Sequence, residues 1–336
     1  MVAKPPTAVT FLAAVLSLVT PSAAGPLASS KRGLVFTPNT TFPSDNYIWT
    51  QQPSDLTWYY NYKPLPSPEF NNVTQAAFEF VPMLWGAPQS WDSDTTFVTT
   101  VESLIKDRNI NISRVLTFNE PDGPTMYGGS DIAPRVAAQV WVNNIIPLQK
   151  LGLEVGLPAC TGGYSGIPWL TEFLGNCSLI LSSADEVRNC TYDFVPLHWY
   201  GNFEGLASHI GEYSAAFPNK TIWITEYNLD HQDLADTQNF YNTSAEYFDR
   251  LPSVERYSLF GAFRSDVSNV GPNAAMLNKD GQLTDIGAWY LGRPGTGIDP
   301  LSGTGASLGR LAASPRVSAA LLGSLLAVST VALLSF

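Results

Sequence analysis

The chain has 336 residues, a net charge of −11 at pH 7, three histidines and three cysteines. An acidic balance of this size argues against a nucleic-acid-binding surface, and the shortage of histidine argues against a His-rich metal site. Three cysteines are too few to build a fold that depends on disulfides.

The first 24 residues have the pattern of a secretory signal peptide. Lys4 precedes an apolar stretch from Val9 to Val19, and the small residues Ser22, Ala23 and Ala24 follow it. Such a stretch is too short to span a bilayer, so we expect residues 1–24 to be removed on secretion.

Eight short apolar segments, rich in β-branched and aromatic residues, predict strands. They are Gly33–Phe36, Trp58–Tyr62, Glu79–Trp85, Arg114–Asn119, Glu154–Ala159, Phe194–Tyr200, Thr221–Glu226 and Tyr257–Phe263. Helical periodicity predicts six helices between and after them: Asp94–Asn109, Ala133–Leu151, Ile167–Leu174, Glu204–Phe217, Leu234–Arg250 and Thr284–Leu291. Repeated alternation of strand and helix predicts one (β/α)8 barrel over residues 25–293. The first two connections, Thr37–Gln52 and Lys63–Phe70, lack helical periodicity, so we expect the early helices to be reduced.

Two predicted strands lead directly into a glutamate. Glu120 follows the fourth strand, and Glu226 ends the seventh. The carboxyl ends of barrel strands form the rim that carries the active site, so both carboxyl groups are expected to face one substrate bond. A carboxyl pair is the requirement of glycoside hydrolysis, and Asn119 would bind the sugar 2-hydroxyl. The structural alternative makes each glutamate a helix cap or an ion-pair partner.

Three segments carry a resemblance to a known family. Leu116-Thr117-Phe118-Asn119-Glu120-Pro121-Asp122, Val195-Pro196-Leu197-His198-Trp199-Tyr200-Gly201 and Ile222-Trp223-Ile224-Thr225-Glu226-Tyr227 resemble the signature segments of the fungal Asl1-like glycosyl hydrolases, glycoside hydrolase family 128. The similarity runs from about Arg32 to Leu291.

This resemblance implies a compact barrel of the retaining hydrolases that acts on, or binds, β-1,3-glucan. It implies that Glu120 is the acid/base, that Glu226 is the nucleophile and that Asn119 positions the sugar. His198 and Tyr200 would lie beside the nucleophile, although His198 is also compatible with a hydrogen-bonded core histidine.

Aromatic residues at strand ends are the candidates for sugar-binding platforms, since sugar rings pack their C–H faces on aromatic rings. We favour Trp85 and Tyr200, with Trp199 and Tyr60 as further candidates, and consider Trp58 a weaker one because it opens its strand. The eighth strand lacks the tryptophan that the family leads us to expect in its Ser258–Arg264 segment.

The cysteines and sequons agree with secretion. Cys177 and Cys190 bracket a polar stretch that a local disulfide could close, which would leave Cys160 as a buried small hydrophobe. Seven Asn-x-Ser/Thr sequons predict N-glycosylation: Asn39, Asn72, Asn111, Asn176, Asn189, Asn219 and Asn242.

The C-terminal end has the pattern of a GPI-attachment signal. Residues 294–316 are rich in Gly, Ser and Pro and predict a flexible stalk, and residues 317–336 form an uncharged apolar tail. Gly305 is the preferred attachment residue, followed by Gly303 and Ser302. A retained transmembrane anchor is the alternative.

Together these features predict a monomeric, cell-surface β-1,3-glucanase without a cofactor, attached to the plasma membrane and active in fungal wall remodelling. A glucan-binding wall protein without turnover, built on the same fold, is the first alternative. An anchored wall protein that serves adhesion is the second. Neither endo versus exo action nor hydrolysis versus transglycosylation follows from the sequence.

Overall fold

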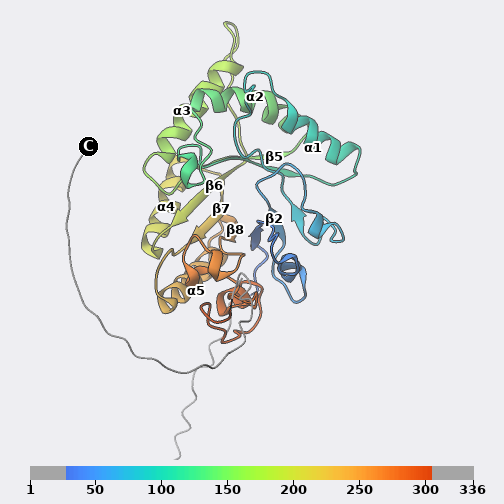
Figure 1. Ribbon diagram of the computed structural model, residues 1–336. Helices are drawn as coiled ribbons and strands as arrows, with labels where there is room; N and C mark the ends of the chain where they lie inside the picture. The colour runs from blue at the N-terminus through green and yellow to red at the C-terminus, as the bar shows by residue number, and fades with distance from the viewer. Residues whose placement is uncertain (1–27, 305–336) are drawn as a thin grey trace, which may run out of the picture. The chain divides into compact units, whose positions relative to one another are not determined.

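A computed structural model describes residues 28–304 (Figure 1). The predicted signal peptide, the preferred attachment residue Gly305 and the apolar tail 317–336 lie outside the described residues. Within 28–304, no helix is both long enough and apolar enough to cross a membrane.

Residues 28–304 contain eight parallel strands in two sheets. The first sheet contains β1 (Gly33–Val35), β2 (Trp58–Tyr60) and β3 (Glu79–Phe80). The second contains, in order, β4 (Arg114–Asn119), β5 (Glu154–Ala159), β6 (Phe194–Tyr200), β7 (Thr221–Asn228) and β8 (Val254–Leu259).

Single parallel bridges join the two sheets at both seams. Met83 pairs with Leu116 at one seam, and Arg32 pairs with Tyr257 at the other. Two backbone hydrogen bonds, Leu116 N to Pro82 O at 2.9 Å and Tyr257 N to Lys31 O at 3.0 Å, reinforce these bridges. The strands therefore follow one another around a barrel, which confirms the predicted fold class.

Five strands differ from their predicted bounds. β1 and β2 end one and two residues early, and β7 continues two residues further, to Asn228. β3 stops at Phe80 instead of Trp85, because Pro82 has no N–H to donate to the ladder. β8 begins earlier and ends at Leu259, because the chain beyond it turns sharply where Phe263 N donates to Gly261 O at 2.7 Å.

Helices cover the outside of the five-stranded sheet (Figure 1). They are α1 (Thr96–Lys106), α2 (Pro134–Lys150), α3 (Gly166–Leu181), α4 (Phe203–Ala216), α5 (Leu234–Arg250) and the short α6 (Asp285–Tyr290). The connections after β1 and β2 contain only 3-10 turns, η1 (Pro43–Thr50) and η2 (Pro68–Phe70), as the lack of periodicity predicted. The remaining 3-10 turns are η3 (Thr125–Tyr127), η4 (Ser265–Val267) and η5 (Pro272–Ala274).

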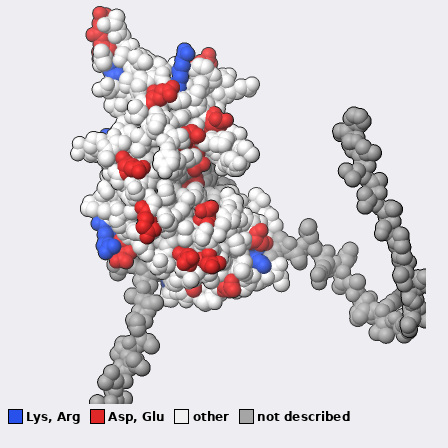
Figure 2. Space-filling view, turned by 90° about the vertical axis from the view of Figure 1, so that its left-hand side faces the viewer, with Lys and Arg blue, Asp and Glu red and all other residues white. Residues whose placement is uncertain are grey.

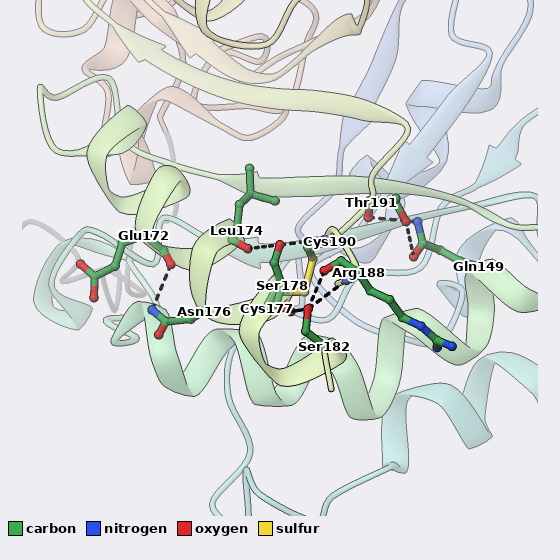
Figure 3. The surroundings of a disulfide bond; sticks show 10 residues. All are labelled: Gln149, Glu172, Leu174, Asn176, Cys177, Ser178, Ser182, Arg188, Cys190 and Thr191. Carbon is green, nitrogen blue, oxygen red and sulfur yellow. Dashed lines mark hydrogen bonds between the residues drawn. A yellow bond between two sulfur atoms is a disulfide. The ribbon is translucent and has the colours of Figure 1, made fainter. Parts of the chain in front are cut away.

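α3 extends seven residues past its predicted end because its buried side chains continue at helical spacing to Cys177. Cys177 forms a disulfide with Cys190, which ties the loop after α3 back to the helix (Figure 3). Ser178 supports the same junction by accepting a hydrogen bond from the backbone N of Cys190 at 2.9 Å. Cys160 is free and fully buried.

Large side chains fill the barrel interior. Trp58 and Trp223 are at most 1% exposed and pack at a tilt of 51° with ring centroids 5.1 Å apart, and the guanidinium of Arg256 lies over both rings. Trp58 is therefore a core residue and takes no part in a sugar-binding surface. Arg256 also pairs with Glu79 at 2.6 Å, near the amino-terminal end of the strands.

The body continues past the predicted domain end at Arg293. Thr296, Ser302 and Thr304 each form hydrogen bonds with residues of the 278–285 region. The predicted stalk of residues 294–316 therefore does not begin at 294, because side chains of the barrel hold this segment as far as Thr304.

The surface is acidic, in agreement with the net charge of −11. Figure 2 shows many Asp and Glu side chains and few Lys and Arg side chains on one face of the molecule.

Candidate active site

Glu120 lies in a tight turn directly after β4. Its φ of +42° is in the left-handed region, and its backbone N donates to Ala159 O at 2.7 Å. Gly129 packs against the same turn, where a Cβ would lie 2.2 Å from the carbonyl oxygen of Gly123. This close packing fixes the backbone that presents the Glu120 carboxyl group at the carboxyl end of the barrel.

Glu226 lies within β7 and is 5% exposed. The hydroxyl of Tyr62 donates to its Oε1, and that of Tyr200 donates to its Oε2, both at 2.7 Å. The Tyr60 hydroxyl is 3.5 Å from Oε1 and donates chiefly to Thr225 O at 2.9 Å. Two tyrosine hydroxyls thus hold both oxygens of one buried carboxyl group.

His198 lies between the two glutamates. Its Nδ1 is 2.9 Å from Oε1 of Glu120, and its Nε2 is 3.6 Å from Oε1 of Glu226. One carboxyl oxygen of Glu120 lies within 4.8 Å of one of Glu226. The structure therefore brings together the three residues that the sequence placed at the ends of β4, β6 and β7.

Burial and charge act in opposite directions on this cluster. Burial raises the pKa of Glu226 above its ordinary value, and the nearby His198 and the hydroxyls of Tyr62 and Tyr200 partly offset that rise. Burial lowers the pKa of His198, but the carboxylates of Glu226 and Glu120 outweigh it, so the net shift is upward. The imidazole of His198 and the carboxyl group of Glu226 therefore each favour the charged form of the other.

A cavity of about 420 Å³ opens above this cluster. The side chains and backbone that line it are Thr37, Tyr62, Trp85, Asn119, Glu120, Tyr127, Gly128, Tyr200, Glu226, Asp230, Phe260, Asn269 and Val270. Its size is in the range of small-molecule sites, and its lining combines aromatic rings with polar groups.

Asn119 has one free polar atom at this cavity. Its Nδ2 donates to Gly128 O at 3.1 Å, whereas its buried Oδ1 has no hydrogen-bond partner among the described residues. A buried acceptor without a partner is costly unless a ligand or water satisfies it. Asn119 also lines the cavity, so this unsatisfied acceptor belongs to a residue of the cavity wall.

Of the predicted platforms, Trp85 and Tyr200 line the cavity, and Trp85 is 38% exposed. Tyr60 does not line it, because it is fully buried behind Glu226. Trp199 does not line it either, since its ring packs against His209 and its Nε1 donates to Asn202 O at 3.0 Å.

Sequence reasoning missed three aromatic residues at the cavity. Tyr62 follows Trp58 and Tyr60 at a spacing of two, so alternation past the strand end was an available signal. Phe260 packs edge-on against Tyr200 and occupies the segment where the family led us to expect tryptophan. Tyr127, in a Gly-flanked turn, had no periodic signal.

Glu120, His198 and Glu226 lie close enough together to be considered as a metal-binding group. Hydrogen bonds already occupy this set: both oxygens of Glu226 accept from tyrosine hydroxyls, and Nδ1 of His198 faces Glu120. These side chains therefore form a hydrogen-bonded carboxyl pair, and we assign no cation to them.

A larger hollow, of about 800 Å³, lies at the amino-terminal ends of β2, β3 and β4. It contains Glu79 and Arg256, which already form an ion pair. Because barrel enzymes carry their active sites at the opposite rim, we place the chemistry at the smaller cavity.

The predicted glycosylation sites lie in different environments. Asn72, Asn111, Asn189, Asn219 and Asn242 are exposed, and Asn176 is half-buried on α3. The amide of Asn39 is part of the fold, since its Nδ2 donates to Asp45 at 3.2 Å and its Oδ1 accepts from Phe42 N at 2.8 Å.

Comparison with known proteins identifies the fold and the family. The family model described as the glycosyl hydrolase catalytic core matches residues 33–290. Alkali-sensitive linkage protein 1 of Schizosaccharomyces pombe is 28% identical over 273 residues, which cover 78% of this chain but only 44% of that relative.

Solved structures of glycoside hydrolase family 128 share the fold. An endo-β-1,3-glucanase from Sorangium cellulosum matches with a TM-score of 0.61 at 22% identity, over 79% of this chain and 99% of that chain. An oligosaccharide-binding protein from Cryptococcus neoformans matches with a TM-score of 0.57 at 24% identity, over 81% and 98% of the two chains. The fold is therefore shared by enzymes and by binding proteins.

Proposed function

Since the chain belongs to the glycosyl hydrolase catalytic-core family, we propose that it hydrolyses β-1,3-glucan by a retaining double displacement, with Glu120 as acid/base and Glu226 as nucleophile. The observation that carries this proposal is the pair of carboxyl groups, with oxygens within 4.8 Å, at the floor of a cavity lined by aromatic residues. Retaining glycosidases hold their two carboxyl groups about 5–5.5 Å apart, whereas inverting enzymes need more room for a water.

The hydrogen bonds favour the assignment of roles. The hydroxyls of Tyr62 and Tyr200 donate to both oxygens of Glu226, an arrangement that stabilises the ionised form required of a nucleophile. Burial raises the pKa of Glu226, and a raised pKa alone would suit an acid. The positive charge that develops on the sugar in the transition state opposes this rise, because it stabilises the ionised carboxylate. No tyrosine of the described chain donates to Glu120, which is also the more exposed of the two glutamates.

In the first step, Glu226 attacks the anomeric carbon while Glu120 gives its proton to the glycosidic oxygen, which leaves with the rest of the chain. In the second step, Glu120 takes a proton from water, and the resulting hydroxide displaces Glu226 from the sugar. The free Oδ1 of Asn119 accepts a hydrogen bond from a substrate hydroxyl during both steps.

A second function, glucan binding without turnover, has support from the oligosaccharide-binding neighbour with the same fold. The complete set of Glu120, His198 and Glu226 favours turnover, because binding alone does not require an acid beside a nucleophile. Rebinding of a glucan chain to the glycosyl-enzyme would give transglycosylation, which product analysis separates from hydrolysis.

The sequence signals support a location outside the cell. We propose secretion, glycosylation and GPI attachment, which would place the enzyme at the fungal surface in contact with wall glucan. The Cys177–Cys190 disulfide supports an oxidising compartment.

The test compares wild type with Glu226→Gln and Glu120→Gln on laminarin and linear β-1,3-gluco-oligosaccharides. We expect both variants to lose more than 99% of reducing-end release, in line with the roughly 10²–10⁴-fold share of acid–base catalysis. An aryl glucoside with a good leaving group should restore formation of the glycosyl-enzyme in Glu120→Gln but not in Glu226→Gln, because such a leaving group departs without a proton from an acid. Product lengths would separate endo from exo action.

Calorimetry of oligosaccharide binding shows whether a protein without turnover still binds glucan. If the wild type binds laminarihexaose but releases no reducing ends, the protein is a glucan-binding barrel, and the carboxyl groups serve as polar contacts.

A further inference from the structure

The loop between β8 and α6 forms one wall of the catalytic cavity. Phe260, Asn269 and Val270 line the cavity from this side. The carbonyl of Val270 accepts a hydrogen bond from His231 N at 3.0 Å, which joins the loop to the one that follows β7. The position of the β8–α6 loop therefore sets the shape of the cavity at this edge.

The part of this loop near the cavity has little regular structure of its own. It contains only the three-residue turns η4 and η5, and Val267, the last residue of η4, is 69% exposed. On one flank, Arg264 fixes it by donating to both carboxyl oxygens of the buried Asp45. What else holds the loop is therefore important for its position.

Residues 296–304, here called the C-terminal strap, cover another flank of the same loop. The buried hydroxyl of Ser265 donates to the carbonyl of Pro300, which is also buried. Asn278 Nδ2 donates to Ser302 Oγ at 3.1 Å, and Lys279 N donates to Ser302 O at 3.3 Å. The middle of the strap is thus bonded to both arms of the loop.

Two aspartates hold the ends of the strap. Asp285 Oδ1 accepts from the backbone N of Thr296 and of Gly297, both at 2.7 Å. Asp280 Oδ1 accepts from the N and the Oγ1 of Thr304 at 3.0 and 3.2 Å. Hydrogen bonds to carboxylates are among the stronger ones, so the strap is held at both ends as well as in the middle.

We propose that the C-terminal strap positions the β8–α6 loop so that Asn269 and Val270 complete the cavity, which makes the affinity for the glucan chain depend on a docked strap. The identity of the ligand rests on the proposed function, whereas the coupling of strap to loop does not. Ser265 and Asp280 act as positioning residues, since neither lines the cavity.

The test is a double variant of the full chain, Ser265→Ala with Asp280→Ala. It removes the side-chain bonds to Pro300 and Thr304 and leaves every cavity residue in place. We expect KM for laminarihexaose to rise roughly three- to tenfold, because the three lost hydrogen bonds act on the cavity only through the loop, with kcat within about twofold. Backbone amides of residues 266–276 should exchange with deuterium faster than in wild type.

Two further variants sharpen the test. The single variant Asp280→Asn keeps an acceptor oxygen for Thr304. It should therefore have the KM of wild type and the same slow deuterium exchange in residues 266–276. Glu102→Ala removes one half-buried acid of an ion pair on α1, far along the chain from the strap, and serves as the control, with no change in KM or loop exchange.

Faster exchange of residues 296–304 without a change in the 266–276 amides or in KM would overturn the proposal. A fall in kcat and in melting temperature at constant KM would overturn it as well, because that pattern indicates a purely structural role. If the wild type proves inactive, the dissociation constant for laminarihexaose replaces KM, so failure of the proposed function is distinguishable from failure of the strap.

Discussion

The hydroxyl of Tyr62 donates a 2.7 Å hydrogen bond to Oε1 of Glu226, from a position two residues beyond the end of β2. Tyr62 has a φ of +59°, so the chain turns there as it leaves the strand. A residue outside any regular element thereby contacts the proposed nucleophile directly.

Replacing Tyr62 by Phe should move the acid limb of kcat/KM to higher pH. The Tyr62 hydroxyl lowers the pKa of Glu226, which burial has already raised, so its loss raises that pKa further. Glu226 must be ionised to attack, and a higher pKa leaves less of it ionised at a given acidic pH. A pH–rate profile on a laminari-oligosaccharide checks this.

Tyr60→Phe is the matched control, because the Tyr60 hydroxyl donates mainly to Thr225 O. It should shift the acid limb less than Tyr62→Phe does. Equal shifts in the two variants would contradict a specific role for Tyr62.

His198 should stabilise the fold most at acidic to neutral pH. Its pKa in the folded protein is raised, so its contribution to the free energy of unfolding is fully present below the unfolded value of about 6.5. That contribution declines as the pH rises through the raised folded value. We expect the melting-temperature difference between wild type and His198→Gln to be larger at about pH 6 than at about pH 9. A difference that grows with pH would refute the assignment.

Trp85→Ala should change substrate affinity, whereas Trp199→Ala should change the stability of the fold. Trp85 is partly exposed at the cavity, so its loss should raise KM for oligosaccharides by roughly tenfold, about 1.4 kcal/mol, with little change in stability. Trp199 packs against His209 away from the cavity, so its loss should lower the melting temperature and leave KM nearly unchanged. Steady-state kinetics and thermal unfolding of both variants separate these outcomes, and a KM effect confined to Trp199→Ala would show that the cavity lining has been misassigned.

Removing the disulfide with Cys177→Ala and Cys190→Ala should reduce the free energy of unfolding by about 2–3 kcal/mol. The two cysteines are 13 residues apart in sequence, and closing a loop of this size restricts the unfolded chain by that order. Urea unfolding with and without reductant measures the effect. The reductant should destabilise wild type and leave the double variant unchanged, and sensitivity of the variant to reductant would contradict the prediction.

The sequence by itself determined the eight strands, the reduced early helices and the two glutamates at strand ends. These features depend on local composition: a strand buried on both faces is continuously apolar, and a polar residue at its carboxyl end stands out from that run. His198, Tyr200 and Trp85 were found for the same reason, since each lies at or near the end of an apolar segment.

Only the tertiary structure decided which aromatic side chains reach the cavity and where the body ends. Tyr60 and Tyr62 have the same residue type and the same predicted strand, but the turn at Tyr62 places its hydroxyl on Glu226 while Tyr60 stays buried. Residues 294–304 have the composition of a flexible linker. Hydrogen bonds from Thr296 to Asp285 and from Thr304 to Asp280 nevertheless hold this segment to the barrel. Composition describes what a segment can do alone, and these outcomes depend on partners that only folding brings within hydrogen-bond distance.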